Sequence, residues 1–325
     1  MNNIAISSLG HYLPKKILTN AELEKIVDTS DEWITTRTGI KERRIALKDE
    51  NTSDMAIGAA KEALKNAKLD GSKIELIVVA TTTADSCFPS VGNIVQDAIG
   101  AHHAAAFDVS AACAGFLYAL TTAKQYLLSG MYKNALVIAA DKFTNLLDWN
   151  DRQTCVLFGD GAGAVILTPT KSKKGIISDY LLSLGKYHQI MYVATEKRKP
   201  LDKEKTEFHF PYAVMHGQEL FKVAVNSMAE AVEIVVERAG MQMSDIDCVV
   251  PHQANDRIIT AIAKKLKVPK EKFFINIHKY GNMSAASVAV ALYEAVEEKK
   301  IQKGSNVVLV TFGAGLVAAA NVVKF

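Results

Sequence analysis

The chain has 325 residues, of which 49% are apolar, 22% charged and 7% aromatic. This composition excludes a disordered, collagen-like or disulfide-scaffold protein and leaves room for one large or two medium domains. The 38 basic and 35 acidic residues give a net charge of +3, which is too near balance to predict nucleic acid as a main partner.

Cysteine usage and hydropathy indicate the compartment. The four cysteines form no CxxC pair and no His/Cys spacing typical of a metal site, so we expect free thiols and no bound metal. No apolar run reaches the roughly 18–20 residues that span a bilayer, and no charged-then-apolar leader opens the sequence. We therefore expect a cytoplasmic protein with no membrane partner.

In the first half of the chain, short β-branched runs alternate with longer helical stretches. The spacing predicts a helix over Asp54–Ala67 and buried strands over Ile74–Ala80, Ala135–Ala140 and Ala164–Leu167. The Gly-rich stretch Phe158–Gly163 lacks the form of a phosphate-binding loop, so we expect a hairpin turn there.

The second half shows the same alternation. Gly217–Ala239 carries apolar residues at helical spacing, and Gly240 is placed to end that helix. Buried strands are expected over three runs, Cys248–Pro251, Phe273–Ile277 and Val307–Thr311. A second hairpin turn is expected at Phe312–Gly315. The polar, non-periodic stretch Lys186–Phe210 predicts an insertion or lid.

A repeat relates the two halves. At an offset of 172 residues, the segment that starts at Ala67 matches the one that starts at Ala239, and Asn134 falls on Asn306. The same offset lays the helix after Cys113 onto the helix after Ala285. The two Gly-rich stretches also match each other, at a different offset. We therefore predict two similar α/β halves, residues 1–172 and 173–325, joined near the Lys/Ser/Gly cluster Lys171–Gly175.

Cys113 lies in Ala-Ala-Cys-Ala-Gly-Phe, where an apolar stretch leads into a helix that begins near the cysteine. The N–H groups and partial positive charge of a helix N-terminus lower the pKa of a thiol and make it nucleophilic. From the residues alone, a small buried cysteine that fills space is an equally good reading. Cys155 and Cys248 are expected in the core, and Cys87 in a loop.

Two polar residues follow expected strands or turns in the second half. His252, in Pro-His-Gln-Ala-Asn, comes at the carboxyl end of a strand, where ligands gather in α/β folds. Asn282, in Gly-Asn-Met-Ser-Ala-Ala-Ser, precedes an apolar helix. A structural histidine and an ordinary turn asparagine are the alternatives. If the two helix starts face each other across a pseudo-twofold, Asn282 comes close to Cys113.

These three motifs, together with Asp31-Glu-Trp-Ile-Thr-Thr-Arg-Thr-Gly-Ile and Phe158-Gly-Asp-Gly-Ala-Gly, resemble 3-oxoacyl-[acyl-carrier-protein] synthase III over essentially the whole chain. The resemblance implies an α/β, duplicated thiolase-like fold, with two similar mixed-sheet halves packed in layers around a pseudo-twofold. It also implies a homodimer.

The resemblance implies a decarboxylative condensation without a permanently bound cofactor. Cys113 would take the acyl group of a short acyl-CoA, most often acetyl-CoA. His252 and Asn282 would stabilise the enolate that forms when malonyl-acyl-carrier protein loses CO2. Backbone N–H groups of Cys113 and Ala314 would form a second oxyanion site. The product would be a 3-oxoacyl thioester that starts type II fatty acid synthesis.

Binding residues are implied at matching positions. Trp33 and Arg152 resemble the pair that stacks the CoA adenine, Arg37 a phosphate contact, and Gly217 and Asn255 pantetheine contacts. Phe88 resembles a residue that reaches the acyl pocket across the dimer. Four basic residues match the patch that docks the acidic carrier protein, or form an ordinary solvated surface: Lys222, Arg257, Lys264 and Lys265.

The sequence departs from the family pattern at Met283, Tyr280, Asp256 and Ala314, and alanine lacks some backbone angles open to glycine. Three other functions remain: a related condensing enzyme with another acyl-CoA or acceptor, a cysteine hydrolase with a Cys-His-Asn triad, and an inactive CoA- or carrier-binding scaffold. Degradative thiolase is disfavoured because no cysteine lies near the C-terminus.

Overall fold

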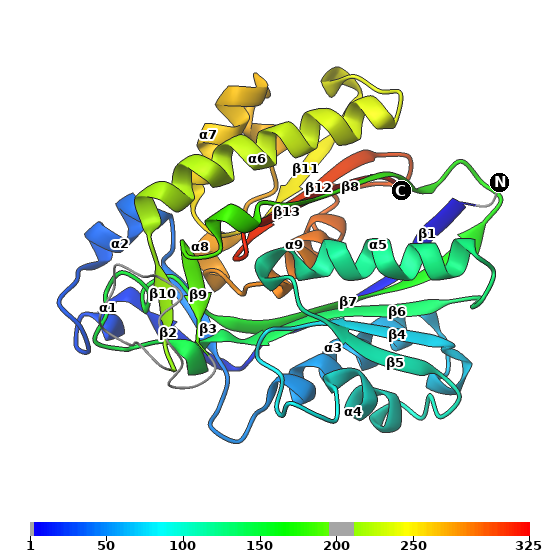
Figure 1. Cartoon of the computed structure of the whole chain (residues 1–325), viewed down its shortest axis with the longest axis horizontal. Helices are drawn as coiled ribbons and strands as arrows, with labels where there is room; N and C mark the ends of the chain where they lie inside the picture. The colour runs from blue at the N-terminus through cyan, green and yellow to red at the C-terminus, as the bar shows by residue number, and fades with distance from the viewer. Residues whose placement is uncertain (1–2, 195–210) are drawn as a thin grey trace.

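Two large β-sheets with helices on both faces make up the body of the protein (Figure 1). The computed structural model describes residues 3–194 and 211–325. The first sheet has the order β1-β7-β6-β4-β5, with β1 (Asn3–Tyr12), β4 (Leu76–Ala80), β5 (Ala105–Val109), β6 (Ala135–Lys142) and β7 (Asp160–Thr170). The second has the order β11-β12-β13-β8, with β8 (Gly175–Ser183), β11 (Cys248–Pro251), β12 (Asn306–Gly313) and β13 (Val317–Lys324).

The helices form three layers around these sheets (Figure 1). Helices α5 (Gly115–Leu128) and α9 (Ala286–Glu297) lie between the sheets and share one apolar core with both. The outer faces are covered by α3 (Thr52–Ala67) and α4 (Val91–Ala98) on one side and by α6 (Gly217–Arg238) and α7 (Asp256–Leu266) on the other. Because the central strands β4, β6 and β12 are buried on both faces, they are almost continuously apolar.

The repeat predicted from the sequence is visible in the strand register. Val78 on β4 pairs in parallel with Val137 on β6, and Val250 on β11 pairs in parallel with Leu309 on β12. Both partners in the second pair lie 172 residues after their counterparts. The duplicated α/β fold is therefore confirmed. The proposed boundary between residues 172 and 173 falls in the link from β7 to β8 and stays a prediction.

The expected helices over Asp54–Ala67 and Gly217–Ala239 are confirmed as α3 and α6, and Gly240 follows α6 with a φ of +68°. The strand expected over Phe273–Ile277 is wrong. Phe273 forms a single bridge with Val249, and a short helix, α8 (Ile277–Tyr280), begins within the run. The side chain of Gln253 accepts hydrogen bonds from the N–H groups of Asn276 and Ile277, so these groups are not available to a strand partner.

The hairpin turn expected at Phe158–Gly163 is also wrong, because β7 begins at Asp160 and includes the later glycines. A Cβ on Gly163 would come within 2.5 Å of the Cβ of Ala289, so glycine lets α9 pack directly on the strand. The hairpin at Phe312–Gly315 is confirmed between β12 and β13. The match between the two Gly-rich stretches is wrong, because Gly163 pairs with Ala139, whereas Thr311, the counterpart of Ala139, pairs with Ala319.

Part of the predicted insertion Lys186–Phe210 forms a small antiparallel ribbon. Strand β9 (Met191–Val193) pairs with β10 (Ala213–Met215), which leads into α6. The remainder of the predicted insertion, 195–210, lies outside the described residues. Elsewhere, α1 (Asn20–Leu23) and α2 (Asp31–Thr38) adjoin a second ribbon of β2 (Lys16–Thr19) and β3 (Glu42–Ile45). Among the described residues, no helix is long and apolar enough to cross a membrane.

Candidate active site

The structure brings Cys113, His252 and Asn282 together on the wall of one cavity of about 130 Å³. Their side chains come from the start of α5, the end of β11 and the turn before α9, and only 3%, 4% and 5% of their surfaces are exposed. The other lining residues are mostly apolar and include Met191, Met215, Met228, Phe158, Phe221 and Phe312. Such a wall excludes water and strengthens hydrogen bonds made inside it.

The two helix starts at the site have matching backbone conformations. Ala112 has a φ of +45° and Ser284 a φ of +49°, and they are 172 residues apart. Non-glycine residues rarely adopt this left-handed conformation, and it recurs where a fold over-determines the backbone at functional sites. The turn at Ala112 presents Cys113 ahead of α5, and the turn at Ser284 follows Asn282 ahead of α9.

The electrostatic environment of Cys113 differs from the sequence-based expectation. Burial raises the pKa of the thiol to about 12, and the negative charge of Asp141 acts in the same direction. Desolvation of the thiolate therefore opposes the lowering of the pKa that the helix N-terminus was expected to cause. Cys113 is a neutral thiol near pH 7, and acyl transfer to it requires that the proton be removed during the reaction.

This environment predicts the pH dependence of thiol reactivity. In a Cys87→Ala background, which removes the exposed cysteine, alkylation of Cys113 by iodoacetamide should accelerate continuously from pH 6 to pH 10, because the thiolate fraction rises about tenfold per pH unit below the pKa. The measurement is the mass-resolved alkylation rate at each pH. A plateau below about pH 8 would show instead a thiol with a lowered pKa.

His252 is a neutral, buried imidazole. Its backbone N–H donates to the carbonyl oxygen of Val310 at 2.8 Å, which fixes the residue at the end of β11. Burial lowers the pKa of the imidazole to about 3, and Nδ1 has no hydrogen-bond partner within the described part of the chain. The ring therefore stays uncharged at neutral pH, and its protonated nitrogen is suited to donating a hydrogen bond to a substrate oxygen.

Asn282 is held by its backbone and by its own side-chain oxygen. Its N–H donates to the carbonyl oxygen of Leu157 at 2.9 Å, and its carbonyl oxygen accepts from the N–H of Gly159 at 3.0 Å. Its Oδ1 accepts from the N–H of Ser284 at 2.9 Å. Because the oxygen is used internally, the amide Nδ2 is the group left to donate into the cavity.

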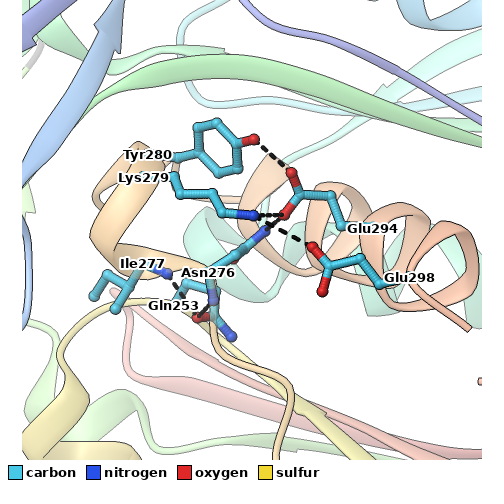
Figure 2. A network of polar contacts seen from close by, with 7 residues as sticks. All are labelled: Gln253, Asn276, Ile277, Lys279, Tyr280, Glu294 and Glu298. Carbon is cyan, nitrogen blue, oxygen red and sulfur yellow. Dashed lines mark hydrogen bonds and ion pairs between the residues drawn. The ribbon is translucent and has the colours of Figure 1, made fainter. Parts of the chain in front are cut away.

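A polar network links Gln253 to the short helix α8 and to Glu294 on α9 (Figure 2). Gln253, next to His252 and fully buried, donates to the carbonyl oxygens of Pro251 and Phe274, and its Oε1 accepts from the backbone at the start of α8. From there, Asn276 and Tyr280 both donate to the carboxylate of Glu294 on α9. Sequence reasoning did not identify Gln253 or Glu294, and the only signal was the position of Gln253 beside His252.

The residues expected to bind CoA lie in two places. Trp33 has the guanidinium groups of Arg37 and Arg152 at 5.1 and 5.4 Å from its ring centroid, so the three side chains form one cluster. Gly217 and Asn255 line the cavity together with Cys113. The residues expected to bind pantetheine therefore lie in the cavity of the Cys113 thiol. The residues expected to bind the adenine and phosphates of CoA lie together around the indole of Trp33.

The remaining candidates lie on the surface. Phe88 is 86% exposed, which is unusual for a large apolar side chain. Lys222, Arg257 and Lys264 are exposed, and Lys265, also exposed, donates to Asn226 at 2.5 Å between α7 and α6. The charge of Asp256, one of the departures, is paired with Lys270 at 2.8 Å.

Two other departures are Met283 and Ala314. Met283 is fully buried in a small cluster with Tyr280, Ala286 and Leu13, and it is not among the residues that line the cavity. Ala314 is not among the non-glycine residues with positive φ, so alanine adopts its backbone conformation without strain there. Within the described ranges, no group of three or more His, Cys, Asp or Glu side chains is placed to hold a metal ion.

The comparisons with known proteins agree with one another. Residues 107–185 match the family model 3-Oxoacyl-[acyl-carrier-protein (ACP)] synthase III, and residues 236–325 match the model of its C-terminal part. The chain is 50% identical to beta-ketoacyl-[acyl-carrier-protein] synthase III of Caldanaerobacter subterraneus subsp. tengcongensis, over 98% of this chain and 97% of the relative.

Solved structures give the same result. The structure superposes on 3-oxoacyl-[acyl-carrier-protein] synthase III from Aquifex aeolicus VF5 with a TM-score of 0.93 and 47% identity, covering 100% of both chains. It also resembles the priming beta-ketosynthase of the R1128 polyketide biosynthetic pathway, with a TM-score of 0.91 and 34% identity over 99% of this chain and 96% of that one.

Proposed function

The chain belongs to the 3-oxoacyl-[acyl-carrier-protein] synthase III family, and on that premise we propose that Cys113, His252 and Asn282 are its catalytic residues. The enzyme condenses an acyl-CoA with malonyl-acyl-carrier protein, and this reaction initiates fatty acid synthesis. The observation that carries the residue assignment is the shared cavity, which is lined by one thiol and two neutral donors from different parts of the chain. In this proposal residues 1–172 supply the nucleophile and residues 173–325 supply the two donors.

Acylation is the first step. The sulfur of Cys113 attacks the thioester carbonyl of the acyl-CoA, and the thiol proton passes to the departing CoA sulfur. The backbone N–H groups of Cys113 and Ala314 stabilise the negative oxygen of the tetrahedral intermediate. Support comes from Gly313, because a Cβ there would lie 2.7 Å from the backbone nitrogen of Cys113. The hairpin backbone therefore approaches the start of α5 closely.

Condensation is the second step. Loss of CO2 from the malonyl thioester leaves its electron pair as an enolate, whose oxygen accepts hydrogen bonds from His252 and from Nδ2 of Asn282. The enolate carbon then attacks the acyl-Cys113 carbonyl, and the Cys113 sulfur leaves. Two neutral donors suit this step because a charged imidazolium would cost about 1.4 kcal/mol for each pH unit above its pKa. The lowered pKa of His252 keeps the ring neutral.

We further propose acetyl-CoA as the preferred primer, since the cavity that contains Cys113 is small and apolar. Mass spectrometry of the intact protein after brief exposure to a panel of acyl-CoA thioesters tests this. Acetyl-CoA should acylate Cys113 at least about tenfold faster than straight-chain thioesters of six or more carbons, because a well-packed wall rejects extra methylenes. Fastest acylation by a branched or longer chain would assign a different primer.

The binding residues complete the proposal. The Trp33 cluster would hold the CoA adenine and phosphates, and Gly217 and Asn255 the pantetheine arm. Lys222, Arg257, Lys264 and Lys265 would dock the acidic carrier protein. The highly exposed Phe88 supports a homodimer in which this side chain is covered by the partner subunit.

The similarity to a polyketide priming synthase leaves a related condensing enzyme as the second candidate, and the acyl-CoA panel separates the two. A cysteine hydrolase is disfavoured by the site itself. A Cys-His-Asn triad requires the asparagine to orient the histidine, whereas Oδ1 of Asn282 is bonded to Ser284 and Nδ1 of His252 is unpartnered among the described residues.

A further inference from the structure

Asp141, at the end of β6, is a fully buried carboxylate that the proposed mechanism does not use. Its Oδ1 accepts from the backbone N–H of Thr82 at 2.8 Å and from the hydroxyls of Thr81, Thr82 and Thr83 at 3.1, 3.2 and 3.1 Å. Its Oδ2 accepts from the backbone N–H of Ala285 at 3.1 Å. A buried charge with this many donors has a defined position, because moving it would leave several groups unpaired.

The contact with Ala285 crosses from one half of the duplicated fold to the other. Ala285 is the residue before α9, and it follows the strained turn at Ser284 whose N–H fixes the Asn282 amide. A carboxylate at this point caps a free N–H and complements the positive end of the helix dipole. The hydrogen-bonded path from Asp141 to the Asn282 side chain therefore runs through two adjacent backbone N–H groups, those of Ala285 and Ser284.

The repeat shows that this arrangement is specific to one half. At the 172-residue offset Ala285 corresponds to Cys113, and Asp141 corresponds to Gly313. At the start of α5, Gly313 lies so close to the backbone nitrogens of Cys113 and Ala114 that a Cβ would be 2.7 and 2.9 Å away. At equivalent positions of the two halves, the carboxylate of Asp141 therefore lies at the start of α9, and Gly313, which has no side chain, lies at the start of α5. The substrate oxyanion is proposed to bind at the start of α5.

We propose that Asp141 is a positioning residue for decarboxylation: its carboxylate occupies the helix start that carries no substrate, and it fixes the turn that aims the Asn282 amide. This inference rests on the proposed function. The residue does not touch the substrate, and its effect passes through the Ala285 and Ser284 N–H groups. It should therefore support the step that uses Asn282, whereas its negative charge raises the pKa of the Cys113 thiol and so does not favour acylation.

The test measures the two half-reactions separately on Asp141→Asn, which keeps the size of the side chain and removes its charge. We expect the kcat for malonyl-acyl-carrier-protein decarboxylation to fall roughly 10- to 100-fold with little change in KM, because a misplaced donor weakens the transition state more than binding. Acetylation of Cys113 by acetyl-CoA should fall less than about threefold or should rise, because loss of the Asp141 charge removes one cause of the raised thiol pKa. Equal losses in both half-reactions, or an unchanged decarboxylation rate, would overturn the proposal.

Asp160→Asn is the matched control. Asp160 is likewise fully buried and accepts from the N–H of Ala46 and from the N–H and hydroxyl of Thr144, none of which belongs to the turn before α9. Its substitution should leave the ratio of the two half-reactions unchanged, and a selective loss of decarboxylation in this variant would contradict the proposal. Wild-type protein that shows neither half-reaction would refute the proposed function instead.

A milder variant guards against misfolding of Asp141→Asn. Thr82→Val removes one hydroxyl donor from Oδ1 and keeps the backbone donor of the same residue. It should reduce decarboxylation about two- to fivefold and leave acetylation unchanged, since one hydrogen bond of several is lost. A thermal unfolding curve close to that of the wild type, together with no change in decarboxylation, would count against a positioning role for the cluster around Asp141.

Discussion

Replacement of Cys113 by alanine will abolish condensation, with a fall of at least about 10⁴-fold in kcat, because the variant has no atom to carry the acyl group. Intact-protein mass spectrometry after exposure to acetyl-CoA should show no acetyl adduct. The variant should still decarboxylate malonyl-acyl-carrier protein, since His252 and Asn282 remain in place and neither depends on the sulfur. The loss is therefore specific to acyl transfer.

Cys87→Ala is the matched control, because Cys87 is exposed whereas Cys113 is buried in the cavity. This variant should acylate and condense at the wild-type rate. An acetyl adduct that still forms in Cys113→Ala, or that is located on Cys155 in the wild type, would show that the nucleophile has been assigned to the wrong residue.

Replacement of His252 or Asn282 by alanine should separate the two half-reactions. Each substitution removes one of two donors to the enolate oxygen, and the loss of one such donor costs about 10²–10³-fold in rate. Decarboxylation of malonyl-acyl-carrier protein should therefore fall by that factor, while acetylation of Cys113 should fall less than about tenfold in Asn282→Ala. The measurements are CO2 release and the rate of adduct formation.

Asn282→Asp sharpens the comparison for this donor. The variant keeps the shape of the side chain and its oxygen toward Ser284, but it replaces the donating Nδ2 with a second oxygen. It should be at least as defective in decarboxylation as Asn282→Ala, because a carboxylate repels the developing enolate charge. Equal losses of acylation and decarboxylation in the His252 and Asn282 variants would contradict the division of roles.

Much of the fold follows from local patterns in the sequence. Strands buried on both faces read as continuous apolar runs, and Cys248–Pro251 was located to the residue for that reason. Two of the failed predictions have non-local causes. The N–H groups of Asn276 and Ile277 donate hydrogen bonds to the side chain of Gln253, which lies more than twenty residues earlier in the chain. Gly163 on β7 is explained by Ala289 on α9, which packs against it from the other half of the chain.

The site was predictable at the level of residue types and motifs, and less so at the level of electrostatics. The motifs around Cys113, His252 and Asn282 were identified from the sequence, and the structure places all three on one cavity. The helix start near Cys113 was also visible, but the burial that raises the thiol pKa arises only when both halves close around it. Asp141 was missed because its contact with Ala285 spans 144 positions.

The central claim is that these three side chains form one condensing site, and a sequential single-turnover experiment tests it most directly. The purified chain is acetylated with acetyl-CoA, freed of CoA and then divided between buffer and malonyl-acyl-carrier protein. The account predicts that acetyl-Cys113 persists in buffer and disappears with malonyl-acyl-carrier protein, as one CO2 and one acetoacetyl thioester appear per acetyl group. Loss of the acetyl group to water at the same rate in both portions, or no acetyl group on Cys113, would contradict it.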